Sequence, residues 1–129
     1  MQPTETEGSH WDRRAARLLR VPFVHACSLA LDGQSPGPGF IVNINELGAY
    51  LASDAVPPLG HGLICRFGLP GIAQDLEIRC EVCWVNPRQP HPVHGVPPGF
   101  GVKFVGLPAD QREAIESIVR AYTERQQPR

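Results

Sequence analysis

The sequence predicts a small all-β domain that carries a single helix at its C-terminus. Its 129 residues include 14 prolines and 13 glycines, which divide the chain into many short stretches. Most of these stretches alternate apolar and polar residues, a pattern typical of strands in an antiparallel barrel or sandwich. After Pro108 the apolar period changes from two to that of an amphipathic helix. At this length we expect one domain with one modest core, and we predict an antiparallel β-barrel.

Composition and charge exclude several classes of protein. The formal net charge is −1, whereas binding to DNA or RNA needs a net basic surface, so no nucleic-acid partner is expected. No run approaches the roughly 18 consecutive apolar residues of a transmembrane helix, so no membrane span is expected. The first ten residues are polar and do not resemble a signal peptide. We therefore expect a cytoplasmic protein whose four cysteines are reduced thiols.

The first twenty residues divide into a tail and an arginine-rich leader. Residues 1–10 are expected to be a disordered tail. Residues 11–20 form a leader arm, either one or two helical turns or irregular, with a single carboxylate, Asp12, against Arg13, Arg14, Arg17 and Arg20. One interpretation is a solvated segment that merely flanks the first strand. The other is an anion clamp, because guanidinium groups bind phosphates bidentately and stack on aromatic rings.

Residues 21–125 are predicted to form the barrel and its helix, and residues 126–129 a polar tail. Strands are expected over residues 21–31, in a hairpin over 40–51, and over 63–67, 76–84 and 100–104. In the first strand, His25 and Cys27 are expected to occupy the core rather than to bind a ligand. The helix, roughly residues 109–124, would plug one end of the barrel or pack on its side through Ile115, Ile118, Val119 and Tyr122.

The hairpin over residues 40–51 holds the clearest candidate for a binding edge. Alternation divides its first strand into two faces, Phe40, Val42 and Ile44 on one and Ile41, Asn43 and Asn45 on the other. The two amides would then lie about 7 Å apart on one face. Gly48 follows the turn, where the missing Cβ allows another backbone or a ligand to come close. We interpret this group as a polar binding edge rather than core.

Neither catalysis nor metal binding is predicted. The sequence has no nucleophile elbow, no phosphate loop and no zinc-protease helix motif, so we expect no enzyme activity and no cofactor. Cys80-x-x-Cys83 and His91-x-x-His94 resemble a compressed zinc pattern. On a strand, however, residues three apart face opposite sides, and Cys80 shares the apolar side with Val82 and Trp84. Tetrahedral zinc needs converging ligands, which this arrangement does not offer.

The order of these features resembles the PilZ domain family over residues 13–124. An arginine-rich leader runs into a strand that opens Arg20-Val-Pro-Phe23, and the hairpin follows. A long strand then ends Trp84-Val-Asn86, and Pro97-Pro98-Gly99 precedes the last strand and the helix. The resemblance implies a six-stranded antiparallel β-barrel with a C-terminal helix. It also implies a non-enzymatic bacterial receptor for the second messenger cyclic di-GMP.

The binding signature of that family is matched only in part. It consists of Arg-x-x-x-Arg in the leader and Asp/Asn-x-Ser-x-x-Gly at the hairpin. Asn43 and Gly48 match the second motif, while Asn45 takes the place of the serine. The first motif has two registers: spacing selects Arg13 and Arg17, whereas counting back from Val21-Pro22-Phe23 selects Arg20 and leaves Ala16 in the first arginine position.

Two functions follow from the resemblance. In the first, cyclic di-GMP is bound by Arg13, Arg14, Arg17, Arg20, Asn43, Asn45 and Gly48, and the ordered leader passes the signal to an effector protein. In the second, the departures Ala16 and Asn45 mark a degenerate PilZ module that binds no nucleotide and works by protein–protein contact. Motility regulation is the general expectation, and motility or envelope regulation is expected for the degenerate module. The oligomeric state, including a homodimer, stays open.

Overall fold

The computed structural model describes residues 20–31, 34–69, 71–90 and 95–126. The predictions for the tail, for leader residues Arg13, Arg14 and Arg17, and for His91 and His94 lie outside these residues. Within them, six strands and one helix follow one another in the predicted order.

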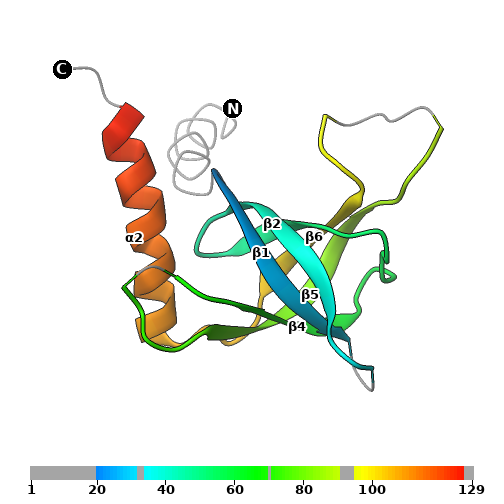
Figure 1. The fold of residues 1–129 in the computed structure, drawn as a ribbon, viewed down its shortest axis with the longest axis horizontal. Helices are drawn as coiled ribbons and strands as arrows, with labels where there is room; N and C mark the ends of the chain where they lie inside the picture. Colours follow the sequence, from blue (N-terminus) through cyan, green and yellow to red (C-terminus); the bar gives the residue numbers. More distant parts are fainter. Residues whose placement is uncertain (1–19, 32–33, 70, 91–94, 127–129) are drawn as a thin grey trace, which may run out of the picture.

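The six strands close into an antiparallel barrel, as predicted (Figure 1). Around the barrel the strands pair in the order β1-β2-β3-β6-β5-β4. The sheet therefore brings β3 beside β6, although two strands lie between them in the sequence. The bounds are β1 Val21–Leu31, β2 Gly37–Ile44, β3 Gly48–Ala52, β4 Gly62–Phe67, β5 Leu76–Asn86 and β6 Gly99–Phe104.

The predicted alternation of β2 is wrong because the strand contains an irregularity. Its register against β3 shifts between Ile41 and Asn43, as a β-bulge does, and the pairing with β1 shifts at the same level, between Pro22 and His25 of β1. One extra residue reverses the faces beyond it, so Ile41 and Ile44 are both fully buried although they lie three residues apart. Phe40 is 53% exposed and lies outside the barrel. Asn43 consequently does not share a face with Ile41.

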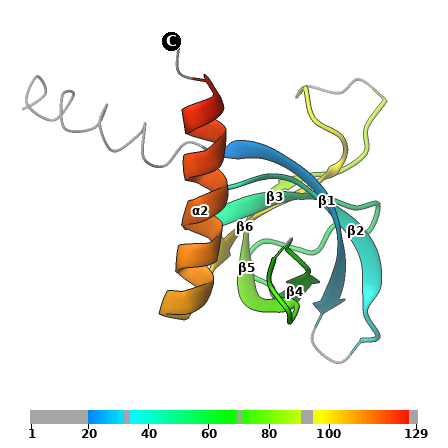
Figure 2. The ribbon, with the colours of Figure 1, turned by 60° about the vertical axis from the view of Figure 1, so that its left-hand side comes forward.

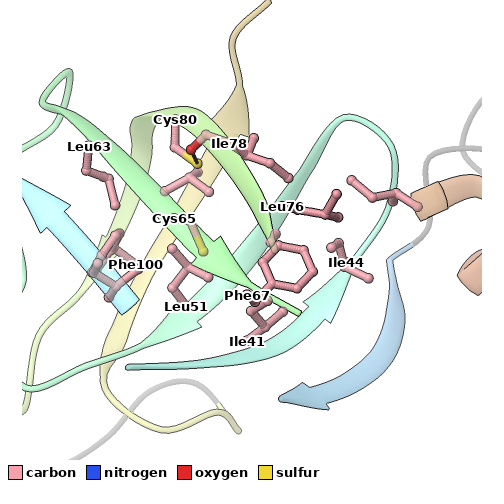
Figure 3. Packing of buried hydrophobic residues seen from close by; sticks show 14 of the residues in the cluster. Ile41, Ile44, Leu51, Leu63, Cys65, Phe67, Leu76, Ile78, Cys80 and Phe100 are labelled. Carbon is pink, nitrogen blue, oxygen red and sulfur yellow. Dashed lines mark hydrogen bonds between the residues drawn. The ribbon is translucent and has the colours of Figure 1, made fainter. Parts of the chain in front are cut away.

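A second register shift corrects the prediction for Trp84. The pairing of β5 with β6 shifts between Val82 and Trp84, so these residues do not lie on one face. Val82 is buried, whereas Trp84 is 38% exposed on the outside of the barrel. Before this point the strand alternates as predicted, with Leu76, Ile78 and Cys80 buried. The inward side chains pack with those of β2, β3, β4 and β6 into a single core (Figure 3).

The helix α2, Ala109–Gln126, stands at the end of the barrel where β1 begins and β4 ends (Figure 2). Ile115 is fully buried and belongs to the core, and Ala114, Ile118, Val119 and Tyr122 pack against it. The predicted helix is confirmed and continues two residues further than expected. In the part of the chain that the structure describes, no helix has the length and apolar character needed to cross a membrane.

The four cysteines are free thiols with different surroundings. Cys80 is buried and Cys83 is exposed, which confirms that the two side chains face opposite sides of β5. Burial raises the pKa of the Cys80 thiol to about 12. Cys27 is half-buried against the core, as predicted, and His25 stacks on Phe23 with ring centroids 5.3 Å apart. Among the described residues, no three potential metal ligands converge.

Candidate ligand-binding face of the barrel

Four residues form a lateral row across the outside of β2, β3, β6 and β5. Asn43 pairs with Tyr50, Tyr50 with Gly101, and Gly101 with Trp84. Directly opposite residues of antiparallel strands project to the same face of a sheet, so these side chains share one surface. Ala49 and Leu51, on either side of Tyr50, belong to the core cluster, so alternation along β3 turns the buried Tyr50 to the outer side of the barrel. We call Asn43, Tyr50, Gly101 and Trp84 the row residues.

Two of the row residues form a rigid aromatic platform. The rings of Tyr50 and Trp84 have centroids 5.4 Å apart and are tilted by 48°. The Tyr50 hydroxyl donates to the carbonyl oxygen of Pro97 at 2.6 Å and accepts from Nδ2 of Asn86 at 3.1 Å. Burial raises the pKa of the Tyr50 hydroxyl, and the hydrogen bond from Asn86 opposes this effect. The hydroxyl therefore stays neutral and donates a hydrogen bond. Its two hydrogen bonds hold the Tyr50 ring in place next to Trp84.

The guanidinium group of Arg20 lies beside Gly101, next to this platform. A Cβ atom added to Gly101 would lie 3.8 Å from Nη1 of Arg20 and 3.5 Å from Cβ of Trp84. Because Gly101 has no side chain, the half-buried guanidinium group of Arg20 and the side chain of Trp84 both lie close to its backbone. Burial lowers the pKa of the Arg20 guanidinium, and the nearby Cys83 acts in the opposite direction. Among the described residues, no carboxylate lies within ion-pair distance of Arg20.

Asn43 offers an unused acceptor at the other end of the row. Its Oδ1 atom is buried and accepts no hydrogen bond from the described residues. Buried polar atoms are nearly always hydrogen-bonded in native proteins, so an exception of this kind calls for a donor from elsewhere. The face therefore combines a desolvated cation, an aromatic surface and an unsatisfied acceptor.

Asn45 and Gly48 lie next to this face, at the turn between β2 and β3, and determine its shape. Asn45 is only 3% exposed, and its Oδ1 accepts hydrogen bonds from the backbone N–H of Leu47 at 2.8 Å and of Gly48 at 2.9 Å. A Cβ atom on Gly48 would lie 2.1 Å from the carbonyl oxygen of Val102. The sequence predicted that either a backbone or a ligand comes close to Gly48. The structure shows the backbone of β6 there.

The seven predicted site residues therefore fall into three groups. Arg20 and Asn43 lie at the row, Asn45 and Gly48 hold the adjoining turn, and Arg13, Arg14 and Arg17 lie outside the described residues. The sequence reasoning missed Tyr50 and Gly101 and placed Trp84 on the wrong side of its strand. Only the pairing of β3 with β6 and of β6 with β5 could have brought these three together.

Comparison with known proteins identifies the family. The family model of the PilZ domain matches residues 12–121, so this chain belongs to the PilZ domain family. Among solved structures, it is similar to the PilZ domain of CeSA from a cellulose-synthesizing bacterium, with a TM-score of 0.55 and 15% identity. That likeness covers 81% of this chain and 98% of the other, and at this identity it supports the fold alone. No curated protein matches. PilZ domains are, in general, cyclic di-GMP receptors and typically non-enzymatic binding modules.

Proposed function

We propose that this protein is a non-enzymatic receptor that binds cyclic di-GMP on the outer face formed by the row residues. The observation that carries the proposal is the Arg20 guanidinium over Gly101, beside Trp84 and without a described carboxylate partner. A half-buried cation without a counter-charge is stabilised when an anion binds it. Cyclic di-GMP supplies two phosphates and two guanines, which suit such a cation in two ways.

Each group on the face has a part in this proposal. Arg20 binds a phosphate, or binds O6 and N7 of a guanine bidentately. The exposed face of Trp84 stacks on a guanine, a contact worth about 1–3 kcal/mol. Oδ1 of Asn43 accepts a hydrogen bond from the guanine amino group. Arg13, Arg14 and Arg17 close over the bound ligand from the leader.

The departure Asn45 is compatible with binding in this scheme. Its Oδ1 already accepts hydrogen bonds from two backbone N–H groups of the turn. A serine hydroxyl at this position could accept a hydrogen bond of the same kind. We therefore assign Asn45 and Gly48 to shaping the turn that presents Asn43, rather than to contacts with the ligand. On this assignment the change from serine to Asn45 costs no ligand contact.

Signal transmission is the second part of the proposal. Ordering of the leader on ligand binding would expose a new surface to an effector protein, in bacterial motility or envelope regulation. The alternative, a degenerate module that acts by protein contact alone, rests on Ala16 in the register that places Arg20 second. In that register one of the two signature arginines is missing, and Arg13 or Arg17 must replace it.

Calorimetric titration of the purified chain with cyclic di-GMP at two salt concentrations tests the proposal. We expect a dissociation constant of about 10 μM or tighter. Binding should weaken only moderately at the higher salt concentration, because phosphate contacts are screened more strongly than buried guanine contacts. No heat at ligand concentrations of several hundred micromolar, on the order of 50 times that constant, would favour the degenerate module.

A further inference from the structure

An apolar groove runs between α2 and the start of β1, and it meets the row at Pro22, which pairs with Asn43. It encloses about 500 Å³ and is lined on the barrel side by Pro22, Phe23, Leu69 and Ile72. On the helix side its lining reaches from Ala114 to Arg125, and Arg125 is the one charged residue among the described lining. Ile72 is 44% exposed in this groove. A hydrophobic hollow of this size beside the core would be stabilised by an apolar side chain placed in it.

The leader enters the barrel at the edge of this groove. The described chain begins at Arg20, two residues before the lining residue Pro22, and 19 residues precede it. In the leader, Trp11, Ala15, Leu18 and Leu19 recur with the spacing of one helical face. Arg13, Arg17 and Arg20 recur at the same spacing on the opposite face. The leader sequence therefore encodes an amphipathic helix with an apolar stripe and an arginine stripe.

The dimensions of the two elements agree. A helix over the nine residues 11–19 is about 13.5 Å long, and the stretch of α2 from Ala114 to Arg125 rises about 16.5 Å. The apolar stripe carries no charge, and Arg125 is the one charged residue among the described lining residues. The stripe can thus cover the groove without burying an unpaired charge.

We propose that the apolar stripe of the leader occupies this groove when no ligand is bound. The occupant is the leader of the same chain, since its last residue lies two positions from the groove. In this state Arg13 and Arg17 point away from the barrel, and Trp11 is shielded from water.

Where the proposed function holds, docking of the leader regulates it. Arg20 already lies at the row, but Arg13 and Arg17 point away from the barrel in the docked state, so binding of cyclic di-GMP through them competes with docking. A leader that is docked about nine-tenths of the time lowers the apparent affinity about tenfold. A partner that recognises the vacated groove would then respond to the ligand.

Fluorescence of Trp11 tests the docking without any ligand. Replacing the second tryptophan, Trp84→Phe, leaves Trp11 as the single reporter. We expect blue-shifted emission and quenching by acrylamide that is several-fold weaker than in urea. In that background, Ala121→Phe fills the groove and should restore quenching, whereas Thr123→Phe, on the other side of α2, should not. Full quenching of Trp11 in the parent protein would overturn the proposal.

Two further outcomes are decisive. If Ala121→Phe fails to fold, replacing Leu18 and Leu19 by aspartate removes the stripe outside the barrel and should expose Trp11 in the same way. Protection of Trp11 that increases with protein concentration would mean that the leader of a second copy fills the groove, which contradicts docking within one chain.

Titration with cyclic di-GMP, with Trp84 retained, tests the competition separately. Ala121→Phe should bind the ligand several-fold more tightly than Thr123→Phe, because its leader is free. Equal affinities would refute the competition. Absence of binding in both variants would contradict the proposed function but would leave the fluorescence result for Trp11 standing.

Discussion

The outer surface of the barrel has two faces that differ in how their polar groups are satisfied. On the face of β4 and β5, Arg66 lies 3.4 Å from Asp75 and 3.3 Å from Glu77, and Lys103 of β6 lies 3.7 Å from Glu81. On the row face, no described residue supplies a carboxylate partner for Arg20 or a hydrogen-bond donor for Oδ1 of Asn43. On the first face Arg66 and Lys103 have acidic partners, whereas the second face holds a cation and an acceptor that no described residue pairs.

This contrast separates residues that hold the barrel together from residues to which we assign the ligand. The family signature contains residues of both kinds. Asn45 accepts hydrogen bonds within the turn, and Gly48 allows β6 to come close. In contrast, Oδ1 of Asn43 has no donor and Arg20 has no carboxylate partner among the described residues. The predictions below test this division, starting with the largest expected effect.

Gly48→Ala should destabilise the fold by about 3 kcal/mol or more, because the added Cβ meets a backbone oxygen that cannot move aside. Gly99→Ala is the matched control outside the signature, since its Cβ would lie 2.0 Å from the carbonyl oxygen of Leu51. Chemical denaturation should give similar losses for both variants. A stable Gly48→Ala protein that binds no ligand would show instead that this glycine belongs to the binding face.

Arg20→Ala should weaken cyclic di-GMP binding at least about tenfold, which corresponds to about 1.4 kcal/mol or more. Arg66→Ala is the control on the β4–β5 face, and it should leave the affinity unchanged. Its exposed ion pairs are expected to contribute at most about 1 kcal/mol to stability. Calorimetry measures the affinity of both variants for cyclic di-GMP. Equal losses of affinity would contradict the assignment of the ligand to the row face.

The two signature asparagines should respond in opposite ways. Asn45→Ala leaves the N–H groups of Leu47 and Gly48 without an acceptor, so the free energy of unfolding should fall by about 1–3 kcal/mol. Asn43→Ala removes an oxygen that has no described donor, so stability should stay within about 0.5 kcal/mol while affinity falls. Denaturation and calorimetry on each variant check this prediction. A loss of stability in Asn43→Ala equal to that in Asn45→Ala would contradict it.

Alkylation of the two cysteines on β5 should give the smallest effect. Cys83 is exposed beside Arg20, and its Sγ lies 3.5 Å from the carbonyl oxygen of Gly101, so bound ligand should slow its reaction with iodoacetamide several-fold. Cys80 is buried with a raised pKa and should stay unmodified at neutral pH with or without ligand. Peptide mass spectrometry distinguishes the two thiols. A rate at Cys83 that ligand does not change would argue against binding on this face.

Periodicity predicts most of the fold because most strands are regular. The bounds of β1 are those expected, and the alternation of β4 and of the first half of β5 is that of the structure. The faces of Phe40 and Trp84 were wrong because one extra residue in a strand reverses every later side chain, and no local pattern reveals that residue.

The site was harder to predict than the fold for a different reason. Asn43 and Arg20 stand in recognisable motifs, so the sequence offered them as candidates. Tyr50, Gly101 and Trp84 become neighbours only through β6, which pairs with β3 and with β5. Such long-range register depends on closure of the whole barrel, so no short stretch of sequence carries it.

An NMR titration with cyclic di-GMP tests the central claim most directly. Backbone amide signals of Asn43, Tyr50, Gly101 and Trp84, and the indole N–H signal of Trp84, should shift together and saturate with one dissociation constant. Signals of β4, where Arg66 is already paired with Asp75 and Glu77, should not move. Shifts centred on β4 and β5 around Arg66, or no shifts at saturating ligand, would contradict the assignment of the row face as the binding site.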